Sequence, residues 1–269
     1  MPGAAFTCLV RGELRKVVHQ GINRALPAVA LAVGWAAAAQ AREQGAGLGP
    51  FPLALDTYRT FAAAAAGVVV LAVSAQLVAG EYQQGTIRVL LARGVGRLTL
   101  LAAKLAAVAI VALPVLAVLA MAGPVAVALQ LGGQPAPVEW REVWPAALTV
   151  ALSAATGTII GVAAGAVGRS MTFAMAVAAG FFPIDNALGT VLPILQNATQ
   201  ERIWADLTTY LLGPTLNHLP SVLMGRHAGE LVPPALPVDA VHALLVIGGY
   251  VVVLLTVALV TFRIRDVHE

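Results

Sequence analysis

Residues that could do chemistry are few in this 269-residue sequence. Its only two lysines, Lys16 and Lys104, do not follow a glycine, so no Gly-x-x-x-x-Gly-Lys loop is present to hold the phosphates of ATP. None of the four serines lies in Gly-x-Ser-x-Gly, and no His-Glu-x-x-His zinc motif occurs. We therefore expect no catalytic residue and no cofactor bound by this chain.

Metal ligands are equally sparse. With one cysteine, Cys8, the chain has no internal disulfide and no multi-cysteine metal site. His218 and His227 lie near Asp206 and Glu230 in the sequence, but these residues do not have the spacing of metal ligands. We expect no metal site.

The amino-acid composition indicates whether the chain folds in water or in a lipid bilayer. Hydrophobic residues make up 59% of the sequence and charged residues only 11%, too little charge to cover a soluble globule of this length. Disordered chains have the opposite composition, poor in apolar residues and rich in charge. A surface that faces lipid needs no charged coat, so the composition predicts a membrane protein.

Six apolar runs bounded by charge approach or reach the roughly 20 residues that a helix needs to span a bilayer. They predict an all-α membrane protein with six transmembrane helices, at about residues 26–41, 60–79, 98–122, 143–167, 171–195 and 241–262. Lys104 is the only charge in the third run, which stays apolar to Leu131, and we expect Pro114 and Pro124 to kink or end it. The two residues between the fourth and fifth runs, Arg169 and Ser170, predict antiparallel neighbouring helices.

The distribution of basic residues predicts the orientation, because cytoplasmic loops retain Lys and Arg. With the N-terminus inside, eleven of the 16 Lys and Arg residues fall on the inner side and five on the outer side. An even number of spans also puts the C-terminus in the cytoplasm. We therefore expect a multi-pass protein of the cytoplasmic (inner) membrane.

The basic residues sit at membrane edges, where they contact lipid headgroups, so we expect no nucleic-acid partner.

Two segments on the inner side are predicted to be amphipathic helices. Residues 4–20 place an apolar stripe beside Arg11, Arg15 and Lys16, which favours a helix in the membrane interface over a plain cytoplasmic helix. Residues 81–97 form a short helix with one apolar face (Ile87, Leu90, Leu91), an opposite face turned to the cytoplasm (Glu81, Arg88, Arg93) and a glycine stop (Gly94, Gly96). The second segment suits docking of a cytoplasmic partner, although a solvated loop would also obey the positive-inside rule.

The second segment resembles a motif of the six-span permease subunits of ABC-2 type ABC transporters. In that family a segment like Glu-Tyr-x-x-Gly-Thr-x-Arg follows the second span, then leucines, an arginine, and a lysine early in the third span. The matching residues here are Glu81, Tyr82, Gly85, Thr86, Arg88, Leu90, Leu91, Arg93, Arg97 and Lys104. The sequence departs from the pattern at Gly94-Val95-Gly96, where many relatives have Pro before a Ser-Arg pair.

The resemblance implies a permease subunit that forms the pathway for an unidentified substrate, with export as the usual direction. A wall of Ala, Val and Leu is compatible with lipids, hydrophobic drugs or peptides. Residues 81–97 would be the coupling helix held by a separate cytoplasmic ATPase, which binds the ATP and Mg, and a second copy or a related permease would complete the transporter. We expect Glu81 and Arg88 to make polar contacts with the ATPase, and Tyr82, Leu90 and Leu91 to pack.

The fourth span carries Gly157, Gly161 and Gly165 at four-residue spacing, continued N-terminally by Ser153 and Thr149. A row of small residues lets two helices approach closely in lipid. The sequence leaves open whether the partner helix belongs to this chain or to a second copy, with the first slightly favoured.

Asp185 is the single charge within the fifth run, and a carboxylate inside a bilayer is a functional candidate by default. Because Pro183 precedes it, we expect the helix to break there. Residues 184–195 would then form a re-entrant or outer segment, with Asp185 near the outer interface capping a helix start. The alternative is a place for Asp185 in the transport pathway, in a secondary transporter coupled to protons or ions.

Residues 196–239 form the predicted outer segment. Ile203, Trp204, Leu207 and Leu211 share one face of a short helix, which could lie at the outer mouth and gate release.

A purely structural membrane protein is a third class, but it would have no need of the inner docking helix.

Overall fold

The computed structural model describes residues 2–18, 50–130, 140–223 and 238–264, with isolated positions between 28 and 39. In these ranges all regular elements are helices, and no strand occurs. Four helices of the described chain are long and apolar enough to cross a membrane: α3 (Pro50–Gln83), α6 (Trp140–Gly168), α7 (Met171–Thr199) and α10 (Ala240–Ile264). These contain the predicted second, fourth, fifth and sixth spans. The chain is an all-α membrane protein, as its composition predicts.

The two other predicted spans have different outcomes. The third lies on α5 (Arg97–Gln130), a 34-residue helix that does not end at Pro114 or Pro124 as we allowed. Each proline removes one backbone hydrogen bond, whereas ending a helix in hydrocarbon leaves several unsatisfied. The first, residues 26–41, falls mostly outside the described residues. Six spans therefore remain a prediction.

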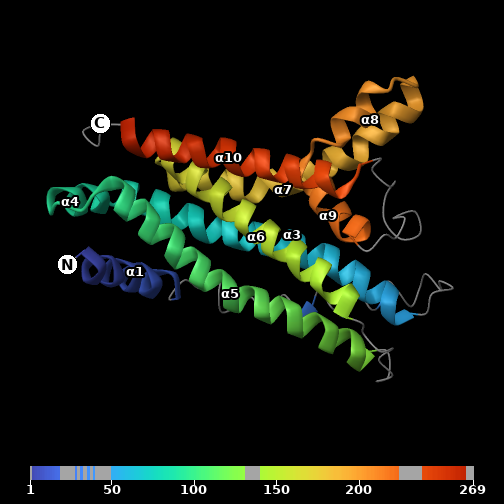
Figure 1. Ribbon diagram of the computed structural model, residues 1–269, viewed down its shortest axis with the longest axis horizontal. Coiled ribbons are helices and arrows are strands. Elements are labelled where there is room, and N and C mark those ends of the chain that lie inside the picture. Colours follow the sequence, from blue (N-terminus) through green and yellow to red (C-terminus); the bar gives the residue numbers. More distant parts are fainter. Residues whose placement is uncertain are drawn as a thin grey trace.

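The helices lie side by side in an elongated bundle with two different ends (Figure 1). One end carries α1 (Pro2–Val18), α4 (Thr86–Ala92) and the last turn of α10. We call it the inner end, because the sequence predicts that it faces the cytoplasm. At the other, outer end lie α8 (Ile203–Thr208) and α9 (Leu212–Leu223). Helix α1 and the last turn of α10 thus lie at the same end of the bundle.

Helix α3 forms the centre of the bundle and runs parallel to α6. Glycines on α6 make the contact possible: a Cβ added to Gly157 would lie 2.4 Å from the carbonyl oxygen of Gly67, and one added to Gly161 would lie 2.3 Å from that of Leu71. The row continues with Ser153, whose Oγ donates to the carbonyl of Ala63 at 2.6 Å. The small-residue stripe therefore packs within this chain, the alternative that we slightly favoured.

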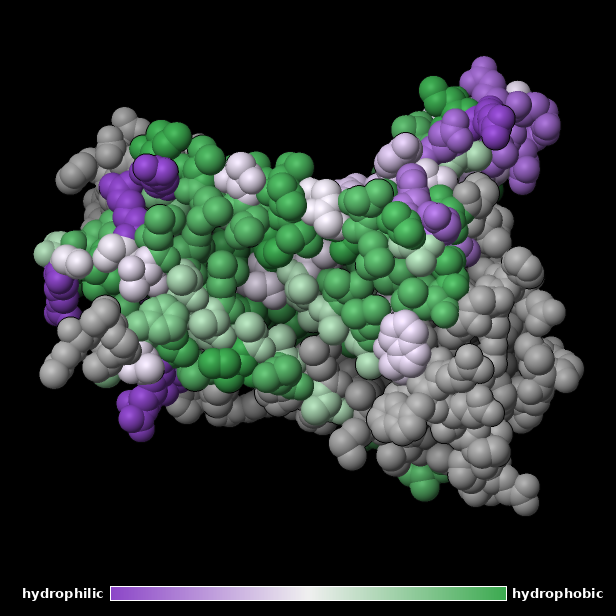
Figure 2. Space-filling view, in the orientation of Figure 1, coloured by the Kyte–Doolittle hydropathy of each residue, from purple (hydrophilic) through white to green (hydrophobic). Residues whose placement is uncertain are grey.

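Burial separates the central helices from the peripheral ones. The buried share of the most apolar stretch is 72% in α3 and 67% in α6, against 17% in both α7 and α10. Figure 2 shows the resulting surface, a hydrophobic band between hydrophilic ends. Exposed side chains such as Leu245 and Val252 on α10 belong to this apolar surface. Since lipid requires no polar coat, α7 and α10 have the surface of membrane-facing helices.

Helix α7 corrects one prediction. It runs unbroken from Met171 to Thr199 through Pro183 and Pro193, so residues 184–195 are not a separate re-entrant or outer segment. As in α5, the loss of one hydrogen bond at a proline costs less in lipid than opening the helix. Ser170 caps the start of α7, its Oγ accepting the backbone N–H of Phe173 at 3.5 Å, and the two-residue turn joins antiparallel neighbours as predicted.

Candidate coupling site

The segment predicted as one helix over residues 81–97 is built from three parts. Residues 81–83 are the last turn of α3, a tight turn follows, and only Thr86–Ala92 form α4. Gly85 makes this turn with a φ of 67°, a left-handed conformation that favours glycine. The Thr86 hydroxyl donates to the carbonyl of Glu81 at 3.3 Å, which ties the start of α4 to the end of α3.

The glycine stop at the end of α4 is confirmed. Gly94 has a φ of 80°, its N–H donates to the carbonyl of Leu91 at 3.0 Å, and the N–H of Val95 donates to that of Leu90 at 3.3 Å. This pair of bonds is the Schellman motif, which satisfies carbonyls at a helix C-terminus. Residues 93–96 therefore form a compact link between α4 and α5.

Helix α4 presents different residues to the bundle and to solvent. Ile87 is buried, and Leu90 and Leu91 are partly buried, so the apolar side of α4 is turned toward the protein. Val89 is 52% exposed, and Arg93 is exposed beside it. The side chain of Arg88 lies outside the described part of the structure.

Glu81 does not face the cytoplasm, contrary to our prediction. It is only 5% exposed, and its carboxylate contacts the ammonium groups of Lys16 at 2.5 Å and Lys104 at 2.6 Å. The prediction placed Glu81 on the polar face of the following short helix. Because it belongs to α3 instead, its side chain points toward α1 and α5, where the half-exposed Lys16 and the buried Lys104 hold it.

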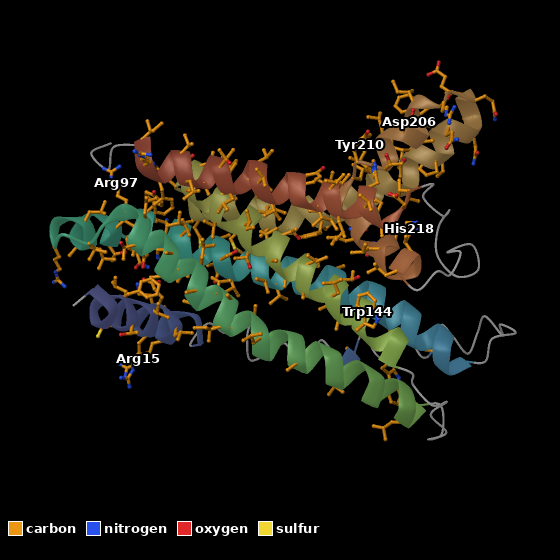
Figure 3. All side chains as sticks on the ribbon, viewed as in Figure 1. Arg15, Arg97, Trp144, Asp206, Tyr210 and His218 are labelled. Atoms are coloured by element: carbon orange, nitrogen blue, oxygen red, sulfur yellow. The ribbon has the colours of Figure 1, made fainter. Side chains whose placement is uncertain are left out.

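Glu13, Lys16, Glu81 and Lys104 together form what we call the charge cluster. Besides Glu81, Lys104 contacts Glu13 at 3.3 Å, and Lys16 contacts Glu13 at 3.1 Å. Burial opposes the charged form of Lys16, but the carboxylates of Glu81 and Glu13 outweigh it and raise the pKa of Lys16 above 10.5. Arg15, on the same helix, points away from the bundle into the surroundings (Figure 3).

Sequence reasoning did not pair these four residues. Two features of the sequence indicate an ion pair. Lys104 is the only charge in the third span, and Glu13 is a single acid among the basic residues of α1. A charge within an apolar run calls for a partner. The partner could not be chosen, since Glu13 and Lys104 are 91 positions apart in the chain.

Tyr82, the residue after Glu81 on α3, contacts α10 and the turn between α6 and α7. Its ring lies 5.9 Å from that of Phe262 on α10, and the guanidinium carbon of Arg169 lies 5.7 Å from its centroid. Arg97, at the start of α5, donates to the carbonyls of Phe262 and Arg263 at 3.4 and 3.3 Å. The end of α3 is thus held to α1 and α5 by charge, and to α10 and the turn between α6 and α7 by its aromatic ring.

Asp185 occupies a second buried polar site, away from the inner end. Its carboxylate accepts the backbone N–H groups of Leu212 and Gly213, the first residues of α9. The contact is close: a Cβ added to Gly189 would lie 2.3 Å from Cγ of Pro214. Asp185 therefore does cap a helix start, but the helix is α9, and the carboxylate reaches it from the middle of α7.

The outer segment is only partly as predicted. Helix α8 exposes Ile203 and Leu207, whereas α9 buries Leu212, Leu216 and Leu219 against α3, α7 and α10. At the side of α9, Asn217 donates to Asn186 at 3.0 Å. Residues 224–237, including His227, lie outside the described residues. Within the described ranges no group of three His, Cys, Asp or Glu could hold a metal ion.

A bundle of long apolar helices with a separate charged cluster and a short capped helix at one end has the form of a multi-pass membrane protein. Residues 49–267 match the family described as ABC-2 family transporter protein, so the chain belongs to that family. It is therefore an ABC transporter membrane subunit, and the family implies an ATPase subunit as partner. No match was found among curated proteins.

Proposed function

We propose that this chain is the permease subunit of an ABC exporter and that a cytoplasmic ATPase docks on the exposed side of α4. The observation that carries the proposal is the division of α4: its buried residues attach it to the bundle, while Val89 and Arg93 remain exposed at the inner end. Closure of two ATPases around ATP would push α4 and shift the bundle between inward-open and outward-open states, a population shift driven by a partner.

The complete transporter would contain two copies of this chain, or this chain and a related permease, in the cytoplasmic membrane with both termini inside. An apolar wall of Ala, Val and Leu is compatible with lipids, hydrophobic drugs or peptides as the exported substrate. ATP and Mg would be bound by the ATPase.

The docking surface can be tested by reversing its charge. We expect Arg93→Glu, in a chain co-expressed with each ABC ATPase encoded near its gene, to lower the amount of co-purified ATPase by about tenfold, because interface charges set partner choice. Val89→Asp should do the same by placing a charge in the apolar contact. Arg202→Glu, an equal charge change on an exposed residue at the outer end, is the matched control.

Two results would contradict the proposal. Unchanged co-purification of the ATPase with both α4 variants would place the docking surface elsewhere. Transport by the purified chain alone, driven by a proton gradient, would instead favour the secondary transporter.

A further inference from the structure

The charge cluster has an alternating arrangement in which each carboxylate contacts both ammonium groups. Glu81 contacts Lys16 and Lys104 at 2.5 and 2.6 Å, and Glu13 contacts the same two lysines at 3.1 and 3.3 Å. Two positive and two negative charges leave the cluster neutral. No single pair can be separated without weakening its neighbours, since every member serves two partners.

The cluster lies where three helices meet. Glu13 and Lys16 come from α1, Glu81 from the last turn of α3, and Lys104 from the second turn of α5. Lys104 is fully buried and also donates to the carbonyl of Leu77 at 3.2 Å. Glu13 is 3% exposed, and only Lys16 reaches the surface.

Burial makes the cluster resist separation. Removing one partner of a buried ion pair leaves an uncompensated charge, which costs far more than the pair contributes. If the end of α3 moved away from α5, Lys104 would lose Glu81 inside the protein. The ends of α1, α3 and α5 must therefore move together while the cluster is intact.

Helix α4 is joined by short links to the two helices that supply Glu81 and Lys104. Two residues, Gln84 and Gly85, separate α4 from α3, and the compact Gly94 turn joins α4 to the start of α5. Both chain neighbours of α4 thus carry a member of the cluster within about two helical turns. A force on α4 reaches Glu81 and Lys104 at the same time.

We propose that the charge cluster makes α1 part of the coupling unit, so that α1, α4 and the inner ends of α3 and α5 respond to the ATPase as one body. Glu81 is then a positioning residue that acts through Lys104 and Glu13, and it makes no contact with the ATPase. The coupling part of this inference rests on the proposed function; the role of the cluster in holding α1 does not.

A double-mutant cycle on Glu81 and Lys104 tests the proposal. Glu81→Gln and Lys104→Met each leave the cluster with a net charge, whereas the double variant leaves Glu13 and Lys16 as a neutral pair 3.1 Å apart. We expect each single variant to lower permease-stimulated ATP hydrolysis about fivefold or more, and the double variant to return within about twofold of the wild type. Co-purification of the ATPase should remain close to normal in the variants that fold.

The recovery in the double variant distinguishes a positioning residue from a docking residue. If Glu81 contacted the ATPase, Lys104→Met could not restore coupling, and the double variant would be as defective as Glu81→Gln. That result, or full coupling in both single variants, would overturn the proposal. Glu201→Gln, the same substitution on an exposed residue at the outer end, is the control and should behave as the wild type.

A second measurement needs no ATPase. Cys8 is the only cysteine in the sequence and lies exposed on α1, so spin labels on Cys8 and on a cysteine replacing the exposed Ala102 of α5 report the position of α1. In nanodiscs, we expect one narrow distance distribution for the unmodified cluster, a broad one for Glu81→Gln, and a narrow one again for the double variant. A narrow distribution in Glu81→Gln would overturn the proposal.

The complementary cycle keeps the test decisive if Lys104→Met does not fold. Glu13→Gln alone leaves a net charge, whereas Glu13→Gln with Lys16→Gln leaves Glu81 and Lys104 paired at 2.6 Å. We expect Glu13→Gln alone to lower permease-stimulated ATP hydrolysis and the double variant to restore it. If the proposed function is wrong, the wild type will not stimulate ATP hydrolysis, but the spin-label distance distributions will still be as expected. If this inference is wrong, the distance distributions themselves will differ from those expected.

Discussion

Two of the buried acids of the bundle, Glu81 and Asp185, are satisfied by different means. At the inner end Glu81 contacts two ammonium groups from other helices. Midway along α7, Asp185 accepts backbone N–H groups at the start of α9. A carboxylate held by a lysine depends on a partner's charge, whereas one held by backbone dipoles depends mainly on hydrogen-bond geometry. The inner site should thus be sensitive to charge, and the outer site to the loss of an acceptor.

The largest effect is expected from removing a cation at the inner site. Lys104→Met leaves two buried carboxylates with Lys16 alone and should lower the free energy of unfolding by about 3–5 kcal/mol. Reversible unfolding in mixed SDS micelles measures the change. The double variant with Glu81→Gln should be clearly more stable than Lys104→Met; equal stability would show that the inner acid does not depend on charge.

A smaller effect is expected from disturbing the bundle between the two sites without touching a charge. Gly161→Val puts side-chain atoms where even a Cβ would lie 2.3 Å from the carbonyl oxygen of Leu71, and overpacking of this kind costs about 1–3 kcal/mol. Because α3 carries Glu81 and also packs on α7, both sites should loosen, measured by cysteine accessibility at each end. Ala155→Val, on an exposed position of α6, should have little effect.

A still smaller effect is expected at the outer site, and only when the acceptor is lost. Asp185→Ala leaves N–H groups at the start of α9 without their acceptor, at a cost of about 1–2 kcal/mol. Asp185→Asn keeps an acceptor oxygen and should cost less than about 1 kcal/mol. Unfolding in SDS compares the two variants. Loss of transport in a stable Asp185→Asn variant would instead place Asp185 in the pathway.

The smallest effect is expected from pH at the inner site. The pKa of Lys16 is raised above 10.5, so its contribution to stability is complete below that pH and is lost only as pH rises through the higher folded value. The Cys8–Ala102 spin-label distance should therefore stay constant between about pH 7 and 9. Release of α1 within that range would mean that Lys16 is not held by the two carboxylates.

Much of the fold follows from patterns within single segments. Apolar length predicted α3, α6, α7 and α10 because a bilayer demands a helix of a certain length. The left-handed glycine at Gly94 predicted the end of α4, since that conformation is a local property of the chain. The helix break expected at Pro183 was wrong, and α5 does not end at Pro114 or Pro124, because the hydrocarbon environment overrides the local preference of proline.

The sequence by itself determined that this is a membrane protein, where its four long apolar spans lie and which end carries the positive charge, because these depend on composition and on the spacing of neighbouring residues. Only the tertiary structure decided what the few buried charges contact. Glu81 turns away from the predicted docking face, and Asp185 caps a helix other than its own. Such pairings join residues far apart in the chain, and the cost of burying an unpaired charge selects the partner only after the helices have packed.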